Sequence, residues 1–217
     1  MQKMGSIAAF LQAAVAMAMM VVAFGLIGVS VLTDREKLVE MVLHNPTPII
    51  LQDLLKFAAA ALAIILVIAL FNTLRDGSPR QMRVATAFGC FSVLFLLMNA
   101  SLSLYALSQA SVYAQDTTAA GYEMNAMITL LGLIVIFTNG LWYLLLSRSA
   151  LQGKQFPKPL NYLGLSIGFI SLLPCLGIVV LPLSIVWSVW MGWALWQSPR
   201  ITAQQTYYEN YGSIRND

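Results

Sequence analysis

The amino-acid sequence predicts an all-α membrane protein, a polytopic transmembrane helical bundle of six transmembrane helices plus a short external amphipathic helix. Hydrophobic residues make up 59% of the 217 residues and charged residues only 10%, whereas a soluble domain carries about 25% charged residues. Apolar runs of the roughly 20 residues needed to cross the hydrocarbon core recur along the chain. Nearly all charged residues lie between these runs, so we expect the chain to fold within lipid.

The first four apolar runs place helices at about residues 6–32, 49–74, 84–108 and 125–147. The first run follows a lysine, as the apolar part of a signal peptide would. At about 27 residues it exceeds the usual 7–15 apolar residues of a signal segment, and it lacks a clean small-x-small cleavage site. We therefore expect it to be retained as the first helix.

The segment between the first two runs predicts the short amphipathic helix. Thr33 is expected to cap its N-terminus, with Glu36 at the third helical position, which is the arrangement of a capping box. Pro46 and Pro48 are expected to end it. One face would carry four apolar residues, Leu38, Val39, Val42 and Leu43. This pattern is typical of a helix that lies at the outer surface of the membrane.

The last apolar run, residues 160–197, is too long for one crossing and contains the stretch LPCLG at residues 173–177. If that stretch is a turn, helices at 160–173 and 178–197 form a hairpin, and the 12 basic residues divide 9 against 3 across the membrane. With a single crossing they would divide 7 against 5. The nine on one side are Lys3, Arg75, Arg80, Arg83, Arg148, Lys154, Lys158, Arg200 and Arg215.

Basic residues in short loops favour the cytoplasmic side. The sequence therefore predicts the hairpin, in a multi-pass protein of the inner (plasma) membrane with both termini in the cytoplasm. The fifth helix would have only about 14 residues, or 21 Å, which is short of the roughly 30 Å hydrocarbon core. We expect the LPCLG turn to lie recessed below the outer headgroups.

Two polar segments are expected beside the helices. Residues 109–124 form an external loop, which would be either an ordered cap over the outer face or a partner-binding surface. Residues 199–217 form a polar cytoplasmic tail that follows a single transmembrane domain at residues 1–198. The tail contains three clustered tyrosines, and we expect it to be irregular unless a partner orders it. These tyrosines are Tyr207, Tyr208 and Tyr211.

Charged side chains inside a membrane span are rare and mark functional sites, and two are expected in the second helix. Asp53 and Lys56 lie near its outer end, three residues apart and therefore on one helical face. Asn99 on the third helix lies at a depth of about 13 Å from the same side. The three side chains are candidates for a ligand-binding pocket. The alternative is an ion pair that locks two helices together.

Two further patterns concern contacts between helices. Gln12 and Asn139 are expected as a polar pair in the inner half of the bundle, and such amides more often bond across helices than bind a substrate. Gly164 and Gly168 have the GxxxG spacing that allows close helix contact. That spacing more often serves packing within a chain than dimerisation.

Four tryptophans recur every third residue on the last helix. Trp193 and Trp196 fit the aromatic belt at the inner interface. Trp187 and Trp190 lie deeper and are candidates for contact with an aromatic ligand, such as a quinone or pigment, or with lipid. The alternative for both is packing against other helices.

The sequence offers no set of residues that would make an enzyme. His44 is the single histidine, and Cys90 and Cys175 are expected on opposite sides of the bilayer, so neither a metal site nor a disulfide is expected. No Ser/His/Asp set, glycine-rich phosphate loop or CxxC pattern is present. We therefore expect no enzyme activity, no catalytic residue, no metal and no cofactor. The net charge of +3 belongs mostly to the basic inner rim, and no nucleic-acid partner is expected.

Three stretches carry a family resemblance: FNTLRDGSPRQMRVATAFG at residues 71–89, NGLWYLLLSRSALQGKQFPKPLNYLGLSIGFISLLP at 139–174, and IVWSVWMGWALW at 185–196. With them the chain resembles a family of uncharacterised bacterial six-helix integral membrane proteins, a domain of unknown function (DUF4386-like). The resemblance covers roughly residues 71–196. It implies the fold and a cytoplasmic Gly-Pro loop, and it supplies no catalytic residue.

Two functions from different classes follow from these observations. The first is a non-enzymatic integral membrane protein that contacts lipids and other membrane-protein subunits, as an accessory or scaffold subunit of a larger respiratory or photosynthetic complex. The second is a small-molecule or lipid-binding protein or transporter that uses the outer polar pocket around Asp53, Lys56 and Asn99. The scarcity of buried charge favours the first.

Overall fold

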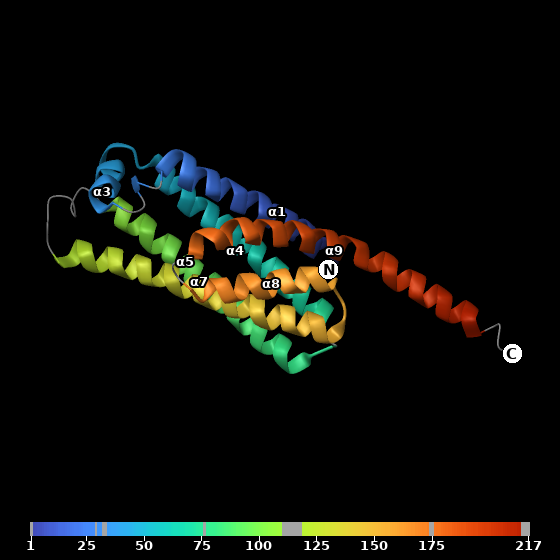
Figure 1. Ribbon diagram of the computed structural model, residues 1–217. Coiled ribbons are helices and arrows are strands. Elements are labelled where there is room, and N and C mark those ends of the chain that lie inside the picture. The colour runs from blue at the N-terminus through green and yellow to red at the C-terminus, as the bar shows by residue number, and fades with distance from the viewer. Residues whose placement is uncertain are drawn as a thin grey trace.

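The computed structural model describes residues 2–28, 30–31, 34–75, 77–109, 119–173 and 176–213, and the regular elements within them are helices. They form one elongated bundle (Figure 1), which confirms the predicted all-α class. The elements in chain order are α1 (Gln2–Val21), η1 (Val22–Ile27), α3 (Arg35–His44), α4 (Thr47–Leu74), α5 (Pro79–Ser108), α7 (Ala119–Gly153), α8 (Lys158–Ser171) and α9 (Gly177–Ser213).

Five segments of the described chain are long and apolar enough to cross a membrane. These segments are Gln2–Ile27, Thr47–Leu74, Pro79–Ser108, Glu123–Gly153 and Val179–Gln197. The element between the last two, α8, has 14 residues and is about 21 Å long, which is shorter than the hydrocarbon core. The predicted count of six transmembrane helices is therefore not confirmed.

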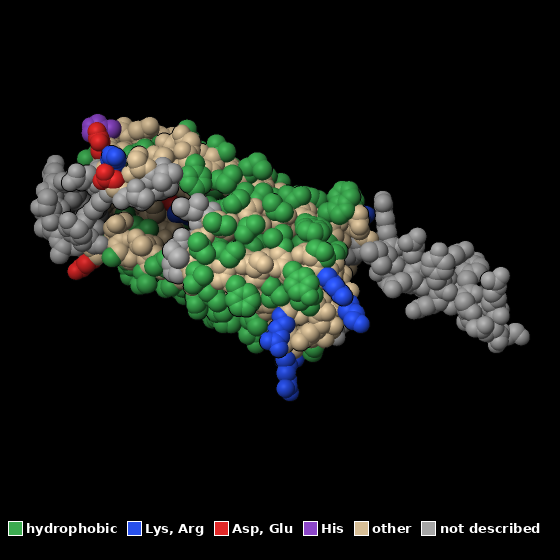
Figure 2. Space-filling view, in the orientation of Figure 1, with side chains coloured by type: hydrophobic (Ala, Val, Ile, Leu, Met, Phe, Trp, Pro, Cys, Tyr) green, Lys and Arg blue, Asp and Glu red, His purple; other side chains and the backbone are tan. Residues whose placement is uncertain are grey.

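Large apolar side chains cover the outside of the bundle, which is the reverse of a soluble domain. Along α5 an exposed stripe follows the helical repeat from Phe91 through Leu94 and Met98 to Tyr105. Figure 2 shows hydrophobic side chains over the middle of the visible face, with Lys and Arg at the end near the N-terminus and a mixture of acidic, basic and His side chains at the opposite end. An apolar belt between charged ends is the surface of a multi-pass membrane protein.

Prolines and one glycine mark several helix ends. Pro48 and Pro79 lie in the first turn of α4 and of α5, where a missing N–H costs nothing. Gly28 ends the wide helical segment η1 with a positive φ of 85°, a conformation that glycine adopts readily. Pro46 and Pro48 were expected to end the surface helix, and that helix does end at His44, before both prolines, while Pro48 lies in the first turn of the next helix.

The surface helix α3 begins one residue later than expected. Its first residue is Arg35, and the backbone N–H of Leu38 bonds to the carbonyl oxygen of Asp34 at 3.1 Å. Asp34 therefore occupies the N-cap position predicted for Thr33, which lies outside the described residues. Both Asp and Thr are favoured at this position.

Glycines allow α8 to lie directly against α7, as the GxxxG spacing predicted. A Cβ added at Gly168 would lie 2.6 Å from Leu144 Cγ and 2.9 Å from the carbonyl oxygen of Gly140. A Cβ added at Gly164 would overlap Ser147 Oγ. The spacing therefore serves packing within the chain, where small residues let two backbones approach.

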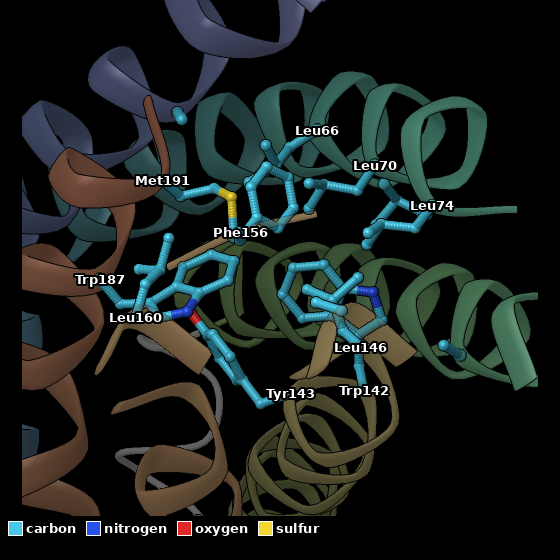
Figure 3. Close-up of a cluster of buried hydrophobic side chains, with 14 of the residues drawn as sticks. Leu66, Leu70, Leu74, Trp142, Tyr143, Leu146, Phe156, Leu160, Trp187 and Met191 are labelled. Atoms are coloured by element: carbon cyan, nitrogen blue, oxygen red, sulfur yellow. The ribbon is translucent and has the colours of Figure 1, made fainter. Parts of the chain in front are cut away.

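The buried core lies between α4, α7, α8 and α9 and centres on three aromatic rings (Figure 3). Trp187 packs edge-on against Tyr143, with ring centroids 4.8 Å apart, and against Trp142 at 5.9 Å. Trp187 is only 1% exposed, so the structure shows the alternative for this residue, packing against other helices, and not contact with lipid. Trp190, one turn further on, is 37% exposed and faces outward.

The chain after Pro199 was expected to be irregular, but α9 continues without a break to Ser213. Figure 1 shows this part of α9 projecting beyond the bundle, past the end at which the N-terminus lies. Proline removes one backbone hydrogen bond from a helix interior. The residues after it include alanine, glutamines and a glutamate, which are good helix formers.

Candidate functional site

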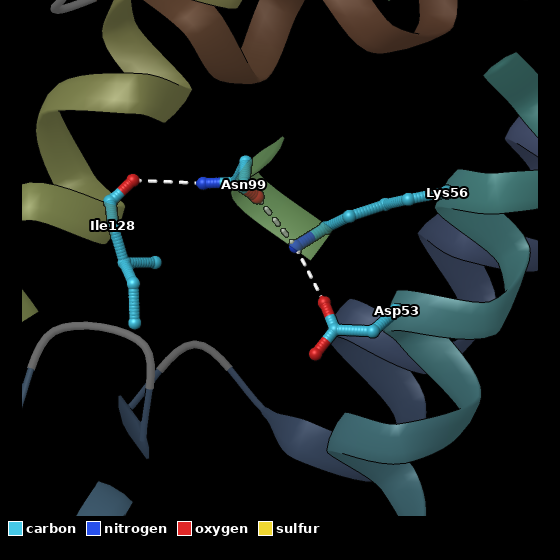
Figure 4. Close-up of polar contacts among 4 residues, drawn as sticks. All are labelled: Asp53, Lys56, Asn99 and Ile128. Carbon is cyan, nitrogen blue, oxygen red and sulfur yellow. Dashed lines mark hydrogen bonds and ion pairs between the residues drawn. The ribbon is translucent and has the colours of Figure 1, made fainter. Parts of the chain in front are cut away.

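The predicted outer cluster is present in the structure and joins three helices (Figure 4). Lys56 Nζ on α4 donates to Asp53 Oδ1 at 2.7 Å and to Asn99 Oδ1 on α5 at 3.0 Å. Asn99 Nδ2 in turn donates to the carbonyl oxygen of Ile128 on α7 at 2.7 Å. The three residues named from the sequence thus form one hydrogen-bonded chain, which ends on a backbone group.

The local geometry follows from helical spacing and burial. Asp53 and Lys56 are three residues apart, so their side chains lie on the same face of α4. The Asp53 side chain is 1% exposed and the Lys56 side chain 19%. Removing both charges from water is costly, and their close pairing and the Asn99 hydrogen bond offset that cost.

The outer cluster can accept one further hydrogen bond. Asp53 Oδ2 is buried and has no hydrogen-bond partner among the described residues. The ammonium group of Lys56 cancels the carboxylate charge, so a bound cation would be repelled as well as attracted. The arrangement therefore suits a neutral donor group.

A second polar region lies in the middle of the bundle, where a cavity of about 110 Å³ opens between α1, α4, α5, α7 and α9. Gln12 and Asn139, the predicted inner pair, both line it. Gln12 Oε1 is buried and accepts no hydrogen bond from the described residues. The two amides therefore share a cavity, and the expected bond across helices does not satisfy this oxygen.

Sequence reasoning missed three polar residues that line the same cavity, namely Ser92, Tyr143 and Ser188. A signal for one of them was available, because Asn139 and Tyr143 are four residues apart and must share a helical face. A weaker signal exists for Ser188, because Ser184 lies four residues before it and therefore shares its face of α9, although the residues around both serines are apolar or aromatic.

The remaining sequence candidates do not join either region. His44 is exposed, and its Nδ1 lies 3.0 Å from the carbonyl oxygen of Glu40. Cys90 is an exposed thiol, and Cys175 lies outside the described residues. Within the described ranges no three His, Cys, Asp or Glu side chains are placed to hold a metal ion.

Comparison with known proteins yields one family. The profile of the family described as a domain of unknown function, DUF4386, matches residues 8–201, which is nearly the whole chain. Neither a curated protein nor a solved structure gives a significant match to this chain.

Proposed function

The chain belongs to the DUF4386 family, and because that family has no established function, we propose one from the geometry of the molecule. We propose a non-enzymatic integral membrane protein that acts by contact, as an accessory or scaffold subunit of a larger membrane complex of the respiratory or photosynthetic kind. Its other partners are the membrane lipids around the apolar belt.

The observation that carries this proposal is the projecting end of α9. The candidate membrane span in α9 is Val179–Gln197, and the sequence after it is polar, whereas the helix ends at Ser213 (Figure 1). The projection has about 16 residues and a length of about 24 Å. A single helix of this length is marginally stable in water on its own. We therefore infer that a partner packs against the projection and stabilises it.

The face of α9 that leads to the projection is also suited to contact. Trp190, Trp193 and Trp196 are all exposed on it. Aromatic side chains are enriched at interfaces between proteins, and they also favour the headgroup level of membranes. A partner subunit seated beside α9 would meet these rings and the projecting helix together.

We further infer that the basic end of the bundle, with both termini, faces the cytoplasm of the inner membrane. Arg80, Arg83, Lys154 and Lys158 are exposed at the end where α4, α7 and their neighbouring turns meet. Figure 2 shows Lys and Arg side chains at this end, whereas Asp and Glu appear at the end with α3, beside a basic side chain and the histidine. The excess of Lys and Arg in short cytoplasmic loops supports that orientation.

Native purification tests the proposal. The chain carries a tag at its N-terminus, is extracted in a mild detergent and is separated by native electrophoresis and mass spectrometry. The full-length protein is expected to migrate with other membrane subunits, and a chain that ends at Gln197 is expected to migrate alone. Migration of the full-length protein as a lone monomer would remove the support for a scaffold role.

Two sets of substitutions test whether the partner recognises the tyrosine side chains or only the length of the projecting helix. Replacing Tyr207, Tyr208 and Tyr211 by alanine keeps the length of α9 and removes its aromatic side chains, and this variant is expected to lose the partner. Replacing Gln204 and Gln205 by alanine is the matched control and is expected to retain it. Equal retention in both variants would mean that the tyrosines play no part.

The second candidate function is the binding or transport of a small molecule or lipid at the outer cluster, and the unpartnered Asp53 Oδ2 favours it. A molecule with a hydrogen-bond donor is then expected to co-purify with the wild-type protein and to be lost from Asp53→Asn. Glu123→Gln, which changes an exposed acid at the same end, is the control. Identical co-purified molecules in all three proteins would rule this function out.

A further inference from the structure

We propose that the central cavity binds a small uncharged molecule with a planar apolar body and a hydrogen-bond donor. The proposal concerns a different place from the projecting helix and the outer cluster, and it does not depend on the proposed function. It rests on the depth of the cavity, on the chemistry of its lining and on one unsatisfied oxygen atom.

The cavity lies near the middle of the membrane spans. Ser92 stands about 20 Å along α5 from Pro79 and about 24 Å from Ser108. Asn139 stands about 21 Å along α7 from Gly153. Binding sites of membrane proteins that hold solutes are commonly found at this depth, between helices.

The lining is polar but uncharged. Five polar side chains reach the cavity from α1, α5, α7 and α9, the indole of Trp142 adds an N–H donor, and no charged residue is among those that line it. The rest of the lining is apolar or aromatic. The five polar residues are Gln12, Ser92, Asn139, Tyr143 and Ser188. A charged ligand would find no counter-ion here, so the site selects a neutral one.

One lining atom requires a donor. Gln12 Oε1 is buried without a partner, and a buried carbonyl oxygen of this kind is normally satisfied by protein, ligand or water. Ser92 Oγ cannot serve it without giving up its own contact, because that hydroxyl donates to the carbonyl oxygen of Val135 at 3.4 Å. An O–H or N–H group on the ligand would satisfy the Gln12 oxygen.

The size and the walls of the cavity define the body of the ligand. About 110 Å³ is several times the roughly 10–15 Å³ that one water needs on the same scale. The ring of Trp142 lines one side, and Leu66, Val67 and Val93 line others. Apolar walls of this kind favour a compact body such as a single ring over a cluster of waters.

Gly89 contributes to the shape of the site. It lines the cavity, and a Cβ added there would lie 2.9 Å from Val67 Cγ2 and 3.0 Å from Trp142. The glycine lets α5 approach the Trp142 ring closely, so that this ring forms a fixed wall.

The test uses tryptophan fluorescence in lipid nanodiscs with two bromine-bearing probes of the same shape. 4-Bromophenol has a hydroxyl donor, and 4-bromotoluene has a methyl group instead. Replacing Trp190, Trp193 and Trp196 by phenylalanine leaves Trp142 and Trp187 as the reporters. In this background 4-bromophenol is expected to quench saturably, with an apparent affinity about tenfold higher than that of 4-bromotoluene.

Gln12→Met removes the amide and keeps the size of the side chain, so it is expected to abolish the preference for 4-bromophenol. Gln52→Met is the matched control, because Gln52 Oε1 is also buried without a partner but does not line this cavity. The control is expected to keep the preference. Asn139→Leu is expected to weaken 4-bromophenol binding as well, and it carries the test if Gln12→Met yields no folded protein.

Two results would overturn the proposal. The first is the absence of saturable quenching by either probe, which would mean that the cavity holds water alone. The second is a preference for 4-bromophenol that survives both Gln12→Met and Asn139→Leu, which would place the probe elsewhere.

Discussion

Lys56 and Asn99 lie 43 positions apart in the chain, and a hydrogen bond of 3.0 Å joins the Lys56 ammonium group to the Asn99 amide oxygen. The same ammonium group pairs with Asp53 at 2.7 Å. One lysine therefore holds α4 to α5 and neutralises a carboxylate that is almost wholly buried. We therefore expect the stability of this end of the bundle to depend on Lys56.

Lys56→Met is expected to lower the free energy of unfolding by about 3–5 kcal/mol, because it leaves the Asp53 carboxylate buried without a counter-charge. The double variant Asp53→Leu/Lys56→Met is expected to lie within about 1 kcal/mol of wild type, because no charge remains to be buried. Unfolding in mixed SDS micelles, followed by circular dichroism, measures both. If the double variant were as unstable as the single one, the loss would come from packing and not from charge.

Asn99→Leu is expected to lower the free energy of unfolding by about 1–3 kcal/mol, because the Ile128 carbonyl oxygen loses its donor and Lys56 loses one acceptor. Asn125→Leu, an exposed amide at the same end of α7, is the control and is expected to change little. The same unfolding assay measures the free energy of unfolding of both variants. Equal effects would show that Asn99 makes no special contribution to the contact between α5 and α7.

The sequence predicts where the helices lie but not how each helix is rotated about its axis. The apolar runs located the helices because length alone identifies a membrane span. Asp53, Lys56 and Asn99 could be grouped because polar side chains are rare within the spans and their depths agree. The rotation of each helix about its axis could not be predicted, because lipid-facing and core-facing residues are both apolar.

The tryptophans of α9 show this limit most clearly. Trp187 is enclosed by Trp142 and Tyr143, whereas Trp190 faces outward, and composition gives no reason to prefer one assignment to the other. Ser188, on the same helix, reaches the central cavity, and Ser184 four residues before it is the polar neighbour that indicates its face. The helical tail was missed because its polar sequence lacks an apolar period and predicts an irregular segment, although a helix can continue past the one hydrogen bond that Pro199 removes.

Gly168→Ala is expected to destabilise the bundle by about 1–3 kcal/mol, because the added Cβ would lie 2.6 Å from Leu144 Cγ and would push α8 away from α7. Gly132→Ala on α7 is the matched control. Its Cβ would meet only Asn99 Nδ2, at 3.7 Å, so the change is expected to be neutral or slightly stabilising. Thermal unfolding in nanodiscs compares the two. Similar melting temperatures would mean that α8 can shift outward at no cost.

The orientation of the bundle and the α8–α9 hairpin can be tested together with single cysteines. In a background in which Cys90 and Cys175 are replaced by serine, a membrane-impermeant maleimide is added to intact cells. Leu43→Cys, on the exposed side of α3, is expected to react at once. Gln155→Cys, between α7 and α8, is expected to react only after the membrane is permeabilised.

Asn210→Cys decides whether the short helix α8 completes a crossing. The 14 residues of α8 are too few to span the core unaided, so its turn into α9 must lie below the headgroups if the hairpin exists. Reaction of Asn210→Cys only after permeabilisation, as for Gln155→Cys, would place both ends of the hairpin on one side. Reaction on intact cells would mean that residues 160–197 cross once, and the basic residues after Pro199 would then lie outside, against the charge preference that predicts the orientation.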